Sequence, residues 1–101
     1  MDSKMEMFCA VALIAGAAGG DKAGVEELLA LGIDVNMKVS GGPTALMAAA
    51  TNGHITMVEF LLNKGADVNA MGDGGQTTLK LASSKGHTAI AELLLAKGAA
   101  K

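Results

Sequence analysis

The 101-residue sequence predicts an all-α fold built from three consecutive helix pairs. Three observations support this prediction. A pattern of residues recurs every 33 residues, each unit contains two segments with apolar residues at helical spacing, and no segment of strand length alternates between apolar and polar residues. Half of the residues are hydrophobic but only 2% are aromatic, which favours close packing of aliphatic helices over an aromatic-centred sandwich.

The repeat is clearest in a phrase of five residues. Gly-Ile-Asp-Val-Asn at 32–36 returns 33 residues later as Gly-Ala-Asp-Val-Asn at 65–69. The same offset relates residues in all three units, among them Leu13 and Leu46, Gly20 and Gly53, Leu28 and Leu61, Thr44 and Thr77, His54 and His87, Leu62 and Leu95. We therefore expect one domain over 1–101, with units at about 4–36, 37–69 and 70–101.

In the first unit, a helix is expected to begin near Met5. Met5, Phe8, Ala12 and Ala15 keep helical spacing where the other units have a Gly-rich loop. The apolar stretch 7–18 lacks the basic start of a secretory signal and is too short to span a bilayer. The Gly-rich run 16–22 fails the phosphate-loop pattern, because its Lys does not follow Gly and no Ser or Thr comes next. We interpret it as the turn between two helices.

The second and third units show the helix pairs more plainly. A helical segment at 46–50 is followed by a break at Gly53 and His54 and then by Met57, Val58, Leu61 and Leu62 at helical spacing. Thr44 and Thr77 precede the first helices, where a hydroxyl accepts a hydrogen bond from an otherwise unpaired amide. The Gly-rich segments 36–43 and 69–76 are predicted to be exposed loops.

At this point the unit resembles the ankyrin repeat, since 44–50, Gly53-His54 and 65–69 match its signature over about 8–99 of the chain. The resemblance implies a right-handed solenoid of three stacked helix pairs with hairpin-like finger loops. Two departures stand out. Ala45 and Thr78 replace the family's Pro after the cap Thr, and Met47 and Lys80 replace its following His. We expect a modest loss of rigidity and more mobile fingers.

The resemblance also implies a protein–protein interaction module that binds its partner through the fingers and the concave face of the first helices. Carried over by position, the partner-binding residues would be Lys38, Ser40, Gly41, Pro43, Thr51, Asn52, Lys64, Met71, Asp73, Gly74, Gln76, Ser84, Lys85 and Lys97. Met37, Met47 and Met71 are candidate apolar anchors, although helical spacing favours a core position for Met47. The alternative is a minimal or engineered scaffold, or a fragment of a longer array, without a dedicated partner. The chain is expected to be a monomer or to self-associate weakly end to end.

Other classes of function lack support. A net charge of −2 offers no basic field for nucleic acid, and neither a membrane partner nor a cofactor is expected. His54 and His87 occupy one repeated position, which predicts a structural role rather than catalysis or metal binding. Glu26, Glu59 and Glu92 recur in the same way, as a solvated or capping position. The single cysteine, Cys9, is predicted to be a buried thiol in a reducing compartment, so the chain is expected in the cytoplasm or the nucleus.

The core and the two ends of the stack can also be predicted. Leu28 and Leu61 share a second-helix position and are expected in the core. At the front, Gly24 stands where Met57 and Ile90 occur, as if no earlier repeat had to be contacted. At the back, the polar residues Lys80, Ser83, Lys85 and Thr88 replace Met47, Ala50, Asn52 and Ile55. Leu95 remains apolar there and is predicted to be exposed.

Overall fold

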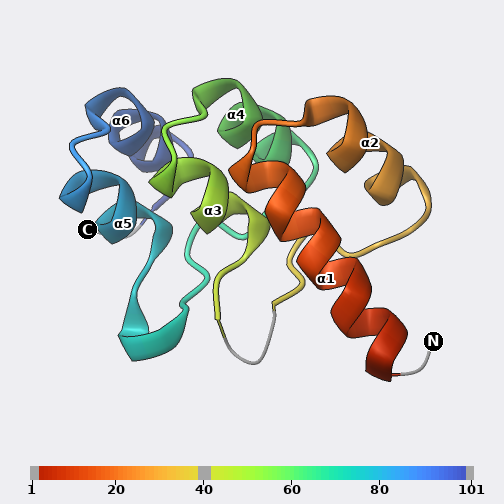
Figure 1. Cartoon of the computed structure of the whole chain (residues 1–101). Helices are drawn as coiled ribbons and strands as arrows, with labels where there is room; N and C mark the ends of the chain where they lie inside the picture. Colours follow the sequence, from red (N-terminus) through yellow and green to blue (C-terminus); the bar gives the residue numbers. More distant parts are fainter. Residues whose placement is uncertain (1–2, 39–41, 100–101) are drawn as a thin grey trace.

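The computed structural model describes residues 3–38 and 42–99, and these residues form three helix pairs arranged side by side (Figure 1). The helices are α1 (Ser3–Ala18), α2 (Lys22–Ala30), α3 (Ala45–Thr51), α4 (Ile55–Asn63), α5 (Thr78–Ser84) and α6 (Thr88–Ala96), with a short 3₁₀ turn η1 at Asp73–Gly75. Within the described ranges the only β pairing is an isolated bridge between Met71 and Thr77. The predicted helical fold is confirmed.

The helices form two rows. The first helices of the pairs, α1, α3 and α5, pack on one another in chain order, and the second helices, α2, α4 and α6, form the row behind them (Figure 1). Each helix pair contacts the pair next to it, so the core extends along the stack instead of closing around a centre. The molecule measures 37 × 28 × 20 Å.

The turn inside each pair depends on glycine, as the middle pair shows. Gly53 has a φ of 77° and follows α3, the His54 amide donates to the Ala49 carbonyl at 3.0 Å, and the Gly53 amide donates to the Ala50 carbonyl at 3.2 Å. This pattern is the Schellman motif, which requires a left-handed residue after the helix. A Cβ at Gly53 would also lie 3.0 Å from the His87 ring. Both the backbone conformation and the contact with the His87 ring therefore disfavour a side chain at this position.

The predicted caps are confirmed. Thr44 accepts a hydrogen bond from the Met47 amide at 3.3 Å, and Thr77 accepts one from the Lys80 amide at 3.2 Å. The first pair adds a cap that the sequence analysis did not identify, because the Asp21 carboxylate accepts from the Gly24 amide at 3.0 Å at the start of α2. These bonds fix where α2, α3 and α5 begin.

The core is aliphatic, as predicted. Its largest fully buried side chains include Leu13, Leu46, Leu61 and Leu94, one or more from each pair. The core position of Leu61 is confirmed, whereas Leu28 is only half-buried and packs against the edge of the core. Leu28 belongs to the first pair, which has a neighbouring pair on one side only.

Helix α1 begins at Ser3, close to the predicted start near Met5. It runs for 16 residues, whereas α3 and α5 have 7 each. Its buried side carries Ala10, Leu13 and Ala17. The stripe that predicted the helix lies elsewhere, since Phe8 is 70% exposed. Cys9 was predicted to be buried but is half-buried, because it lies beside the buried side of α1 and not within it.

The two ends of the stack behave differently. At the front, a Cβ on Gly24 would force the capping carboxylate of Asp21 to move aside, which gives glycine a local advantage at this position. This local cause was not part of the prediction. At the back, Lys80, Ser83, Lys85 and Thr88 are all exposed, as the cap interpretation predicts, and Leu95 is 38% exposed. No helix in the described part of the chain has the length and apolar character needed to cross a membrane.

Candidate protein-binding surface

Two loops project from the same side of the stack and are called here the fingers (Figure 1). The first finger, 33–44, joins α2 to α3, and its residues 39–41 lie outside the described residues. The second finger, 66–77, joins α4 to α5. Of the predicted binding residues, Ser40 and Gly41 therefore lie outside what the structure describes.

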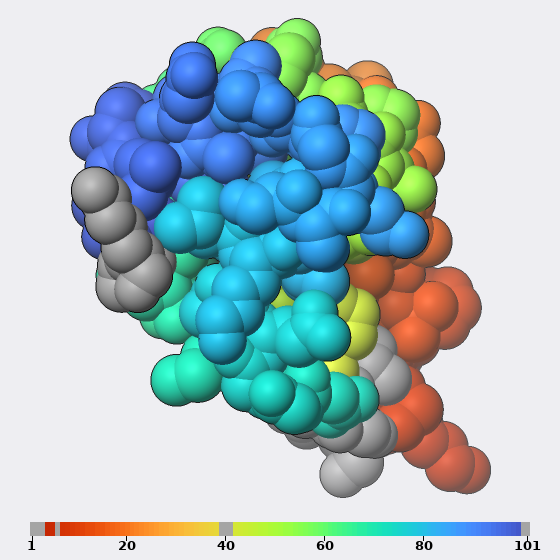
Figure 2. All heavy atoms as spheres, turned by 90° about the vertical axis from the view of Figure 1, so that its left-hand side faces the viewer, coloured from red at the N-terminus to blue at the C-terminus, as the bar shows by residue number. Residues whose placement is uncertain are grey.

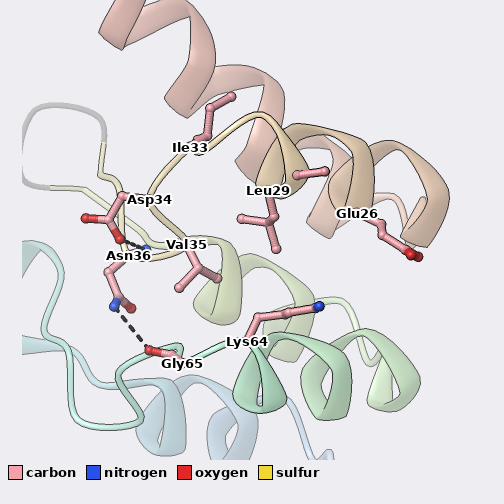
Figure 3. A pocket seen from close by; sticks show the side chains of 9 residues that line it. Glu26, Leu29, Ile33, Asp34, Val35, Asn36, Lys64 and Gly65 are labelled. Atoms are coloured by element: carbon pink, nitrogen blue, oxygen red, sulfur yellow. Dashed lines mark hydrogen bonds between the residues drawn. The ribbon is translucent and has the colours of Figure 1, made fainter.

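Asparagine side chains tie each finger to the next helix pair. Asn36 Nδ2 donates to the Gly65 carbonyl oxygen at 3.3 Å, a bond drawn in Figure 3, and Asn36 Oδ1 accepts from the Asp67 amide at 2.7 Å. Asn69 repeats the first contact with the Gly98 carbonyl at 3.2 Å. The bonds from Asn36 to Gly65 and from Asn69 to Gly98 each join residues 29 positions apart in the sequence. They therefore fix one unit against the next.

The second finger is a small hairpin. Its ends meet at the bridge between Met71 and Thr77, the Gly72 amide donates to the Gln76 carbonyl at 2.8 Å, and Gly74 takes a φ of 71° at the tip. Lys38 Nζ donates to the Met71 carbonyl oxygen at 2.6 Å, which joins the first finger to the second. The described parts of the two fingers are therefore linked to each other.

A hollow of about 230 Å³ lies between the fingers and the first helices. It is lined by Pro43, Met47, Gly72, Asp73, Gln76 and Leu81. Three of these were predicted binding residues, and Lys38, Met71 and Gly74 lie on the same two fingers. We call these six predicted residues, Lys38, Pro43, Met71, Asp73, Gly74 and Gln76, the finger surface. Its charge is mixed, with one lysine and one aspartate.

The remaining predicted residues lie in two other places. Thr51, Asn52, Ser84 and Lys85 are at the carboxyl ends of α3 and α5, whereas the fingers enter these helices at their amino ends. A seven-residue helix is about 10 Å long, so this group is separate from the finger surface. Three of its members already serve the fold: the Thr51 carbonyl accepts from His87, Asn52 Nδ2 donates to the Ala48 carbonyl, and Ser84 Oγ donates to the Leu81 carbonyl.

Lys64 and Lys97 form the third group, because each caps the end of a second helix, α4 or α6. The Nζ of Lys64 lies 5.6 Å from the centre of the Phe60 ring, and the Nζ of Lys22 approaches the same ring at 5.3 Å. Cations near an aromatic face are attracted by its quadrupole. Position in the repeat therefore grouped residues that the structure places on different sides.

The candidate apolar anchors also divide. Met47 is buried beneath the hollow, as its helical spacing favoured, so it cannot project into a partner. Met37 is half-buried. Met71 is 57% exposed on the second finger and is the methionine of the three that a partner can reach most fully.

A groove between the first and second pairs was not predicted from the sequence. This groove of about 520 Å³ is lined by Glu26, Leu29, Ala30, Ile33, Asp34, Val35, Asn36, Lys64 and Gly65 (Figure 3). Glu26 and Lys64 approach it from opposite walls. The recurrence of the Asp-Val-Asn phrase could have indicated it, because those residues form one wall.

The titratable residues have structural contacts. His54 Nε2 lies 2.8 Å from the Ala18 carbonyl oxygen, and His87 Nε2 lies 3.0 Å from that of Thr51. Each ring therefore donates to the preceding helix pair, which explains why histidine recurs at this position. Glu26, Glu59 and Glu92 are exposed. Among the described residues, no group of three His, Cys, Asp or Glu side chains is placed to hold a metal ion.

A row of similar helix pairs, each fixed to its neighbour by repeated side-chain bonds and carrying loops on one side, defines a helical repeat protein. The chain belongs to the ankyrin repeat family, since the family model described as ankyrin repeats in three copies matches residues 12–101. Ankyrin repeats are generally protein–protein interaction modules and are typically not enzymes. A comparison with curated proteins finds no match for this chain.

Proposed function

We propose that this protein binds a partner protein through the finger surface and the hollow beside it. The hollow is the observation that carries the proposal, because its floor is the apolar Met47 and its rim offers the polar groups of Asp73 and Gln76. An apolar floor with a few polar groups at the rim suits one protruding side chain of a partner.

Neighbouring residues supply further contacts. Met71 is exposed beside the hollow, and an unbranched thioether adapts to partner surfaces of different shape. Lys38 and the second finger are already joined by a hydrogen bond, so less conformational freedom is lost on binding than with two separate loops. Mixed charge on the finger surface favours a partner surface without a strong net charge. The proposed compartment is the cytoplasm or the nucleus.

Site-specific photo-crosslinking tests this proposal. A photoreactive amino acid is placed at Met71, at Gln76 or, as a control on the third group, at Lys97. The first two positions are expected to crosslink the same protein, and Lys97 is expected not to. Crosslinking from all three positions, or from Lys97 alone, would contradict the finger surface.

Titration of the purified partner then measures the contribution of the hollow. Gln76→Arg places a long charged side chain at the rim and is expected to weaken binding at least tenfold. Lys97→Glu is expected to leave affinity within about twofold, because exposed residues outside an interface contribute little. If no position crosslinks a defined partner, the chain fits the alternative of a scaffold without a dedicated partner.

A further inference from the structure

The side of α1 that faces away from α3 carries an apolar seam. Met5, Phe8, Ala12 and Ala15 follow the three-four-three spacing of a helix–helix contact, and Val11 lies beside them. Met5 is 56% exposed, Phe8 70% and Val11 50%, and Ala15 is also exposed. A helix with apolar residues on opposite sides is normally covered on both. Within the described part of the chain, α2 and α3 pack on α1, and most of the seam stays exposed.

The seam position of Ala12 is covered in the two later helix pairs. Ala12 is half-buried, whereas its counterparts Ala45 and Thr78 are completely buried, because α3 and α5 each receive the preceding first helix on that side. At Ala12 the seam thus matches a position that the protein buries between its own first helices. The N-terminal part of α1 also protrudes from the body, at the lower right of Figure 2, where a second molecule can reach it.

The side chains of the seam differ in size along the helix. The bulky Met5 and Phe8 occupy its amino-terminal half, and the small Ala12 and Ala15 occupy its carboxyl-terminal half. In an antiparallel pair of such helices, related by a two-fold axis near residue 10, Phe8 meets Ala12 of the other copy and Met5 meets Ala15. Each bulky side chain then faces a small one. A parallel pair would place Phe8 against Phe8 and leave the alanines apart.

We propose that α1 mediates a symmetric homodimer, in which the α1 seams of two copies pack antiparallel. The self-complementary sizes favour a second copy over an unrelated helix, since one helix supplies both halves of the contact. Stacking the seam of one molecule on the back end of another is disfavoured. There the exposed Lys80 and Ser83 stand where the inner interfaces bury Met47 and Ala50.

The contact is short, because residues 5 to 15 of a helix extend over only about 15 Å. Interfaces below about 1,200 Å² belong to weak complexes, so dimerisation is expected at tens to hundreds of micromolar protein. Sedimentation equilibrium over that range measures it. Phe8→Glu is expected to abolish the dimer without changing the helical circular dichroism, since Phe8 is exposed. Leu95→Glu is the matched control at the back end and is expected to leave the dimer intact.

Disulfide trapping tests the antiparallel register in a Cys9→Ser background. A mixture of Phe8→Cys and Ala12→Cys proteins is expected to form the mixed disulfide faster than either protein forms its own, because the antiparallel pair brings these two positions together. Faster self-coupling of Phe8→Cys would overturn the register. A monomer at all concentrations, or a dimer lost with Leu95→Glu but kept with Phe8→Glu, would overturn the proposal. These outcomes do not depend on the finger surface.

Discussion

The Nε2 atom of His54 lies 2.8 Å from the carbonyl oxygen of Ala18, which ends α1 36 residues earlier in the chain. His87 makes the same contact to Thr51 at 3.0 Å. Each ring also covers a glycine, since a Cβ on Gly20 or Gly53 would lie within 3.2 Å of it. The two histidines therefore link successive helix pairs at the turns between their helices.

Replacing His54 by alanine is expected to lower the free energy of unfolding by about 1–2 kcal/mol, because it removes one hydrogen bond and the packing of the ring on Gly20. Urea denaturation followed by circular dichroism measures the change. Glu59→Ala, on an exposed position of the same helix, is the control and should stay within about 0.5 kcal/mol of the parent. An equal loss of unfolding free energy in the two variants would argue against a role of His54 in linking the helix pairs.

Asn36 joins the first finger to the second unit through two hydrogen bonds. Asn36→Ala is expected to cost about 1–2 kcal/mol, since the Asp67 amide and the Gly65 carbonyl lose a protein partner. Hydrogen exchange offers a local readout, in which the Asp67 amide should exchange faster than in the parent protein. Unchanged exchange at Asp67 would show that water replaces the side chain without loss.

Thr78 carries a buried hydroxyl for which no hydrogen-bond partner is found among the described residues. Thr78→Val keeps the shape and replaces this hydroxyl by a methyl group, so it is expected to stabilise the protein by about 1 kcal/mol. The preceding Thr77 supplies the matched control. Its hydroxyl caps α5, and Thr77→Val is expected to destabilise by about 1 kcal/mol. Thermal midpoints that move in the same direction for both variants would contradict this assignment.

Gly24 lies within α2, where replacement of glycine by alanine would ordinarily stabilise a helix by up to about 1 kcal/mol. In this protein Gly24→Ala is expected to gain less than this, because the new Cβ collides with the capping carboxylate of Asp21 unless that side chain moves aside and weakens its bond to the residue 24 amide. The same substitution in an Asp21→Ser background should regain the ordinary benefit, since the shorter side chain leaves space. A double-mutant cycle in urea measures the coupling, and additive effects would rule out the collision.

The helix pairs, the caps Thr44 and Thr77 and the exposed back end could be predicted from the sequence because each is tied to the period of 33 residues. The orientation of α1 could not. Apolar residues surround this helix, so spacing alone does not tell the side of Leu13, which packs on α3, from the side of Phe8, which is exposed. The half-buried state of Leu28 depends on its place in the outermost pair and not on its own segment.

The binding residues were predicted by repeat position, and this explains why they separate into three groups. Position in a repeat tells which loop or helix end carries a residue, but not which of these lie together in space. Gln76 and Thr51 were grouped although Gln76 lies just before the amino end of α5 and Thr51 lies at the carboxyl end of α3. Long-range bonds such as that of Asn36 with Gly65 also depend on how far one unit is displaced from the next, which the period does not specify.

Among the described residues, the main helix contacts lie within one pair or between neighbouring pairs, and this arrangement determines how the molecule comes apart. The outermost pairs are each held on a single side, so they can detach from the middle pair while the remainder stays folded. Unfolding can therefore start at either end of the stack. A ligand bound across both fingers would contact the middle pair and the last pair together. It would therefore stabilise the last pair against detachment.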